Sequence, residues 1–258
     1  MKKNIYIAML MFLILSTHVL MCQDVQDPKT IVNKCVAALG GEEGVKKQLD
    51  YNAEGQFKII VHKFEAAGDV KWIFKVPKYW AKLKATLMGN EITQIQAFDG
   101  KNGWLERMGT LVDQPALNYE SDLAHTIGLL IEKNASFSIS KETEIDGKKA
   151  IGIEANFKDK KTTFFIDQET YLPLEIVFED YYFAENATRE LMEKRIHFLE
   201  YKNIAGVSFP TKTAIYLKGK KLLELDFNSV TFNRPVSANI FSRPDQEMDL
   251  RYSEEIIN

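Results

Sequence analysis

The sequence has few cysteines. Its 258 residues include only two, Cys22 and Cys35, and Cys22 lies at the end of an N-terminal stretch that we expect to be removed. A single remaining cysteine can form neither an intramolecular disulfide nor a cysteine-based metal site. Cys35 lies on the apolar side of a helical pattern, which predicts a small buried hydrophobic residue rather than a reactive thiol.

The sequence also has no strongly basic region and no long hydrophobic run near its start. Its 33 basic and 36 acidic residues are spread along the chain and give a net charge of −3. A nucleic-acid-binding surface needs clustered basic residues, so we expect no nucleic-acid partner. The apolar stretch 5–15 is well short of the ~20 residues that a transmembrane helix needs.

The common catalytic motifs are missing as well. There is no His-Glu-x-x-His zinc motif, no glycine-rich phosphate loop and no Gly-x-Ser-x-Gly elbow. His62, His125 and His197 are far apart in the sequence, and the strand carboxylates alternate as solvated residues do. We therefore predict a protein that is not an enzyme and needs no metal or other cofactor. A carboxylate pair assembled from distant strands, as in glycosidases, is the alternative.

The first 22 residues predict a secretory signal peptide. Lys2 and Lys3 precede the apolar stretch 5–15, and a short polar segment then leads to Cys22. Cleavage near Cys22 would leave a single periplasmic or secreted domain over 23–258. One alternative is a lipid anchor on Cys22, although lipid attachment normally needs a small residue at the position of Met21. The other is a retained membrane anchor, although no basic stop-transfer cluster follows.

Two segments of the remaining chain have helical periodicity. Asp27 suits an N-cap and Pro28 suits the first helical position, while Gly40 and Gly41 end the apolar pattern that follows. A short helical turn is expected over 42–48, and a second helix is predicted over about 118–133.

The rest of the chain alternates with a period of two, which indicates antiparallel strands with one apolar face. Turn residues separate the strands, including Ala66-Ala67-Gly68, Asp99-Gly100 and Asp146-Gly147. A short helical turn is expected over 238–241. We predict about eleven strands, and a sheet of that size curls or closes. No internal repeat or linker divides the chain, so one domain is expected.

Four segments resemble the outer-membrane lipoprotein-sorting (LolA-like) family. Segment 31–41 resembles the opening of members that run into Ala-Leu-Gly-Gly, and segment 98–104 resembles their hairpin of Asp-Gly-Lys followed by Trp. Segment 165–173 resembles their Asp-x-x-Thr-x-Leu-Pro turn, and segment 201–210 resembles a hairpin that ends in Gly-Val-x-Phe-Pro. The four occur in the family's order and span nearly all of the predicted mature chain.

The resemblance implies a mainly β fold, a half-open antiparallel β-barrel of about eleven strands with helices covering the concave face. In that family the concave face receives acyl chains. The family's carrier also has an arginine on the cavity side. No motif identifies Arg107, Arg189 or Arg195 as its counterpart in this chain. The implied function is the binding of lipids or of lipoprotein acyl chains, in lipoprotein sorting or envelope lipid handling. The implied protein is a monomer, with an inner- or outer-membrane complex as a further candidate partner.

The in-facing strand residues are the candidates to line a hydrophobic ligand site, with two residues of the second helix as a lid. Buried apolar surface contributes roughly 25 cal/mol per Å2, so an acyl chain needs no charged anchor. Each candidate could equally belong to a filled core. An envelope sensor or interaction module and an envelope-polymer hydrolase are the alternative functions. The candidates are Phe57, Ile59, Val61, Trp72, Phe74, Leu83, Leu87, Ile176, Phe178, Leu223, Leu225 and Phe227, with Leu123 and Ile127 from the lid.

Overall fold

The computed structural model describes residues 27–61, 64–87, 89–114, 123–158, 160–183 and 189–244. The predicted signal peptide and Cys22 lie outside these ranges, as do His62 and the first five residues of the predicted second helix. Export and the state of Cys22 therefore stay predictions. None of the helices in the described ranges has the length and apolar character needed to cross a bilayer.

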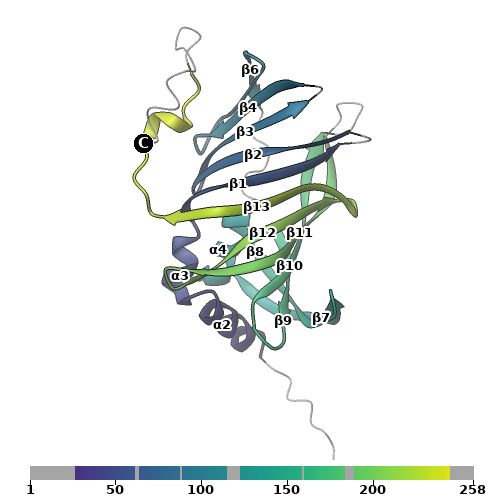
Figure 1. The fold of residues 1–258 in the computed structure, drawn as a ribbon. Helices are drawn as coiled ribbons and strands as arrows, with labels where there is room; N and C mark the ends of the chain where they lie inside the picture. Colours follow the sequence, from purple (N-terminus) through teal and green to yellow (C-terminus); the bar gives the residue numbers. More distant parts are fainter. Residues whose placement is uncertain are drawn as a thin grey trace, which may run out of the picture.

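Thirteen antiparallel strands form one sheet in the described part of the chain (Figure 1), in the order β6-β5-β4-β3-β2-β1-β13-β12-β11-β10-β9-β8-β7. The chain runs outward from β1 to β6 and returns from β7 to β13, so that β13 pairs with β1 and joins the two halves. The strands are β1 (Asp50–Val61), β2 (Phe64–Lys75), β3 (Lys78–Leu87), β4 (Asn90–Phe98), β5 (Gly103–Arg107), β6 (Thr110–Gln114), β7 (Ser136–Ile145), β8 (Lys148–Phe157), β9 (Lys160–Asp167), β10 (Pro173–Phe183), β11 (Arg189–Ile204), β12 (Val207–Leu217) and β13 (Lys220–Phe232).

The prediction of a mainly antiparallel, curved and unclosed sheet is confirmed, whereas the count of about eleven strands is too low. The five-residue edge strand β6 was not predicted, because so short a segment shows little periodicity. The expected turn at Ala66-Ala67-Gly68 is also wrong, since these residues pair with Ile59, Lys58 and Phe57 inside β2. Gly68 marks a close backbone approach instead. A Cβ there would lie 1.8 Å from the carbonyl oxygen of Lys84 on β3.

The two faces of the sheet differ as period-two alternation requires. On β1, Tyr51, Ala53 and Phe57 are buried on the concave face. The residues between them point to the convex face, where Glu54 and Lys58 form ion pairs with β2. These pairs are largely exposed, so they contribute little stability and mainly keep the outer face solvated.

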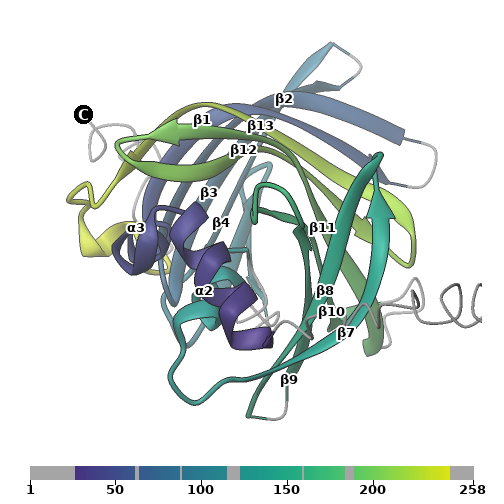
Figure 2. The ribbon, with the colours of Figure 1, turned by 90° about the horizontal axis from the view of Figure 1, so that it is seen from below.

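Three helical segments lie at the concave side, where Figure 2 shows them within the curve of the sheet. They are α2 (Pro28–Ala38), α3 (Gly41–Lys47) and α4 (Leu123–Gly128), the last of which continues into the 3-10 turn η2 (Leu129–Ile131). Asp27 caps α2 as predicted, because its carboxylate accepts a hydrogen bond from the Thr30 amide at 3.1 Å.

The helices and the strands below them form a filled core that we call the helix cluster. Its fully buried members include Cys35, as predicted, and burial raises the pKa of that thiol, which keeps it protonated and unreactive. The buried members are Ile31, Val32, Cys35, Leu39, Val45, Ile127, Leu129, Leu130, Ile153, Ala155, Phe164, Ile166, Ile176, Phe178, Ile196 and Phe198.

Three of the four family-like segments meet beside this core. Lys34 of α2 donates a hydrogen bond to the Tyr171 hydroxyl at 3.0 Å. Tyr201 donates to the Pro173 carbonyl at 2.9 Å, and thereby ties segment 201–210 to segment 165–173. These contacts bring three segments that are far apart in the sequence together in the structure.

The opposite face of the first half is covered by the C-terminal turn η3 (Ala238–Phe241), at the predicted position. Ile240 and Phe241 pack against a cluster that contains Trp80 and Trp104. The Trp104 indole donates to the carbonyl oxygen of Phe241 at 3.2 Å, which satisfies its buried N–H.

Gly40 provides a test of how α2 docks on the sheet. It has φ +105°, and a Cβ there would lie 2.5 Å from the carbonyl oxygen of Gly206. Gly41 has φ +76° with open space around the Cβ position. We expect Gly41→Ala to lower the free energy of unfolding by about 1 kcal/mol through backbone strain alone. Gly40→Ala should cost at least about 2 kcal/mol, because the turn at Gly206 must also move. Urea unfolding measures both, and equal losses would contradict the close contact.

Candidate functional site

On the concave face, the first strands and their neighbours β12 and β13 carry an apolar cluster whose buried members are all strand residues, and we call it the aromatic cluster. Its buried members are Tyr51, Ala53, Phe57, Val70, Phe74, Tyr79, Ala81, Phe98, Phe209, Leu225 and Phe227. Its partly buried members are Ile59, Trp72, Val76, Leu83, Ala85, Ile204, Leu223, Val230 and Phe232. In contrast to the helix cluster, none of these members comes from a helix.

The rings of this cluster contact one another across neighbouring strands. Phe74 stacks on Tyr51 with a centroid distance of 5.2 Å and on Trp72 at 5.3 Å. Phe209 meets the Tyr51 ring edge-on at 4.9 Å, and Phe227 meets Trp72 edge-on at 6.2 Å. Such contacts add to the energy of simple burial and give the face a fixed shape.

Small residues alternate with the rings on this face. Ala53 and Gly55 follow Tyr51 along β1, and Gly68 and Ala81 occupy concave positions on β2 and β3. A Cβ on Gly55 would lie 2.1 Å from the carbonyl oxygen of Asp226, so the close approach of β13 requires glycine there. The concave face therefore carries little side-chain volume at these positions, between its aromatic residues.

One row of paired residues connects the aromatic cluster to the helix cluster. Each residue of the row lies opposite the next on the neighbouring strand, so all of them share the concave face. From β1 to β8 the row is Ile59, Leu223, Ile215, Ile196, Ile176, Phe164 and Ile153. The apolar concave face is thus continuous across the junction of the two halves.

The structure distributes the predicted lining residues between the two clusters. Ile127, Ile176 and Phe178 lie in the helix cluster, where they are packed against other core residues. The side chains of Val61, Leu87 and Leu123 lie outside the description. The aromatic cluster contains Phe57, Ile59, Trp72, Phe74, Leu83, Leu223, Leu225 and Phe227. A ligand-binding role for any of them stays a prediction.

Sequence reasoning missed several members of the aromatic cluster. Tyr51 and Tyr79 share the period-two pattern of candidates on their own strands, so extending each pattern by a few residues would have found them. Phe209 lies within the family-like segment 201–210. That segment was interpreted as a hairpin turn, so Phe209 was not proposed as a lining residue, although it is buried.

Two polar atoms on this face have no partner among the described residues. They are the indole nitrogen of Trp72 and the hydroxyl oxygen of Thr211, both of which are buried. Thr211 lies on β12 between Phe209 and Thr213, and all three are buried. A buried polar group without a hydrogen bond costs about 1–3 kcal/mol, so such groups are uncommon in native proteins.

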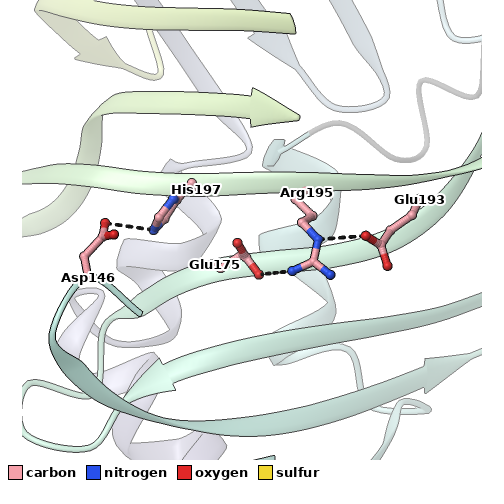
Figure 3. Close-up of polar contacts among 5 residues, drawn as sticks. All are labelled: Asp146, Glu175, Glu193, Arg195 and His197. Atoms are coloured by element: carbon pink, nitrogen blue, oxygen red, sulfur yellow. Dashed lines mark hydrogen bonds and ion pairs between the residues drawn. The ribbon is translucent and has the colours of Figure 1, made fainter. Parts of the chain in front are cut away.

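A group of polar side chains that contact one another lies on the other face (Figure 3). Arg195 on β11 contacts Glu175 at 3.0 Å and Glu193 at 2.7 Å, and these carboxylates raise its pKa. His197 lies 3.3 Å from Asp146, which belongs to the β7–β8 turn and is 70% exposed. Arg195 and His197 alternate with the buried Ile196, so they point away from the concave face.

This arrangement differs from the one that a hydrolase of envelope polymers would need. In its His–carboxylate pair Asp146 is exposed, and the largely buried His197 points away from the apolar surface where a substrate would be enclosed. The described residues contain no group of three or more His, Cys, Asp or Glu side chains that could hold a metal ion. The geometry is that of surface ion pairs which tie the β7–β8 turn to β11.

Removal of the Asp146–His197 contact should therefore have a small effect on stability. We expect Asp146→Ala to change the free energy of unfolding by less than about 1 kcal/mol, because the Asp146 carboxylate is largely exposed. In contrast, Phe164→Ala in the helix cluster should cost about 3–5 kcal/mol. Chemical denaturation compares the two. A loss at Asp146 as large as that at Phe164 would show that the pair is a main structural tie.

One open, curved antiparallel sheet with helices on its concave side is the fold of LolA-like proteins. The structure superimposes on a LolA superfamily protein from Nitrosomonas europaea with a TM-score of 0.52 and 14% identity, covering 84% of this chain and 98% of that one. A DUF1329 family protein from Desulfovibrio piger gives a TM-score of 0.50 at 12% identity, with the same coverage of both chains. At such identities the likeness concerns the fold, and the predicted LolA-like fold is confirmed. No protein-family model and no curated protein matches the sequence.

Proposed function

We propose that this protein is exported from the cytoplasm and binds a lipid, or the acyl chain of a lipoprotein, on the concave face of its sheet. The observation that supports this proposal best is the aromatic cluster, an apolar surface of strand residues that no described helix residue joins. Structural cores can fill such a face completely with helices, as the helix cluster does in the other half.

The energetics of binding are favourable for an unbranched acyl chain. Each buried methylene contributes about 0.8 kcal/mol, so a chain laid along several strands gains enough to offset the loss of its own freedom. Of the apolar row that runs perpendicular to the strands, the first three residues, Ile59, Leu223 and Ile215, are only partly buried and offer such a path. The LolA-like fold, whose concave face receives acyl chains in the family that the sequence resembles, supports the same function.

A second candidate function is an envelope interaction module. It is favoured by two large apolar side chains at the exposed edge of the first half, Met108 with 75% of its surface accessible and Val112 with 49%. They lie in or beside the hairpin of β5 and β6, at one margin of the sheet. An edge strand of this kind can contact a protein partner without any bound lipid.

Native mass spectrometry of the protein purified from a bacterial periplasm separates these functions. We expect a co-purifying lipid or acylated peptide, because the apolar face would retain it. Its loss is expected in Ile59→Asp, which places a charge on the concave row, but not in Leu191→Asp, which changes an exposed residue of β11. The same spectrum shows whether cleavage occurs near Cys22 or leaves a lipid on it.

Circular dichroism and the thermal midpoint serve as folding controls for both variants. A clean ligand-free mass, with no uptake of added phospholipid or lipopeptide by the unaltered protein, would argue against lipid binding. It would favour the interaction module, whose partner would then be sought with Met108 and Val112 variants.

A further inference from the structure

The convex face of the first half is apolar over four neighbouring strands, unlike the convex face of β1. There Glu54 and Lys58 form ion pairs with β2. Over β2, β3, β4 and β5 the same face instead carries a buried apolar patch with two of the chain's three tryptophans. Its sheet residues, which we call the outer patch, are Ile73, Trp80, Ile95, Ala97 and Trp104. An apolar patch of this size requires a cover on a face that is otherwise solvated.

The cover is the C-terminal segment 233–244, which we call the strap and which Figure 1 shows in yellow. The strap continues from the end of β13, contains the turn η3 and pairs with no strand of the described sheet. Ile240 and Phe241 are the only buried residues among those described for it, and Val236 is partly buried against the same patch. One adjacent pair of apolar side chains therefore anchors the strap.

The contacts around this anchor are of the kind that recognise a peptide. The Trp104 indole donates to the main-chain carbonyl of Phe241, and the Lys78 ammonium lies 5.9 Å from the centre of the Phe241 ring. Two residues further on, Arg243 forms an ion pair with Asp113 of β6 at 2.6 Å. The outer patch and its margin thus contact an aromatic side chain, a backbone carbonyl and a basic side chain at fixed spacing.

The root of the strap is incompletely satisfied. The Oδ1 atoms of Asp50 and Asn52 on β1 are buried acceptors without a hydrogen-bond partner among the described residues. Asn52 pairs with Ile73 of the outer patch, and the Asp50 carbonyl accepts from the Asn233 amide where the strap begins. Buried acceptors without donors are costly, so the closed arrangement at the root is not an optimal one.

We propose that the outer patch is a docking site for a segment of another protein, and that the strap occupies it as an internal substitute. The partner's segment carries two adjacent large apolar residues, the second of them aromatic, and a basic residue two positions further on. These are the features of the strap that the patch already contacts. The strap must open before the partner binds, so the partner's apparent affinity is reduced by the fraction of molecules that are open. This site lies on the face opposite the proposed lipid site and does not depend on lipid binding.

The first test measures whether the strap opens while the sheet stays folded. Hydrogen exchange at the Trp104 indole reports this opening, because the indole N–H is buried and bonded to the strap. Relative to their intrinsic rates, we expect the indole to exchange at least about tenfold faster than the Ala97 amide of the neighbouring strand. Equal protection of the two groups would show that the strap opens only when the sheet unfolds, and would overturn the proposal.

The second test uses a fluorescein-labelled peptide with the sequence of residues 236–244 as the probe. Phe241→Ala in the full chain removes the main anchor of the strap, so this variant should bind the peptide at least about tenfold more tightly than the unaltered protein. Arg243→Ala, which removes only an exposed ion pair, should raise the affinity about two- to fivefold. Trp104→Phe in the Phe241→Ala background should weaken peptide binding about two- to tenfold, because the indole donor is lost.

Phe164→Ala is the matched control, because it shortens a buried phenylalanine of the helix cluster that does not contact the strap. It should leave the peptide affinity unchanged, and circular dichroism checks that each variant is folded. If Phe241→Ala does not fold, Arg243→Ala carries the test. Equal peptide affinities of the unaltered protein and the strap variants would overturn the proposal. A dimer of the unaltered protein that Phe241→Ala abolishes would also overturn it, since the occupant would then be the strap of a second copy.

Discussion

The backbone pairing of β1 with β13 is the interaction on which the rest of the structure depends. Nine residue pairs join these strands, which belong to opposite ends of the folded chain. Without this ladder the two halves would be separate meanders, each with an exposed apolar face and an unpaired edge. With it, the rows of apolar residues run unbroken from the aromatic cluster to the helix cluster, and one curved surface results. The pairing is also non-local, so we expect the halves to form before they join.

The two parts of the concave face are packed in different ways as a result. In one half, helices α2, α3 and α4 complete the core, and Cys35 and Ile127 disappear from solvent entirely. In the other half, side chains from neighbouring strands bury one another through aromatic contacts, and C-terminal residues cover the back of the sheet. The aromatic cluster is also largely buried, but without any contribution from the described helices.

Much of this fold could be predicted from the sequence, because period-two alternation and turn chemistry are local signals. Tyr79, Ala81 and Leu83 were assigned to one face of a strand and lie there. The position of the first hairpin turn was not predictable, since Ala66-Ala67-Gly68 has turn composition but is needed for the close approach of β2 and β3. Alternation also cannot show which part of a face the helices will cover. Ile176 and Leu223 therefore seemed equivalent in sequence, although one is core and the other is partly exposed.

The two margins of the sheet, β6 and β7, pair with no common neighbour in the described chain. In a closed barrel, strand number and stagger fix the diameter once and for all. Here the width of the curve is set by side-chain packing and by the connection that crosses from one margin to the other through α4 and η2. In this open sheet the distance between the two margins is not fixed by backbone hydrogen bonds, so it can change without breaking one.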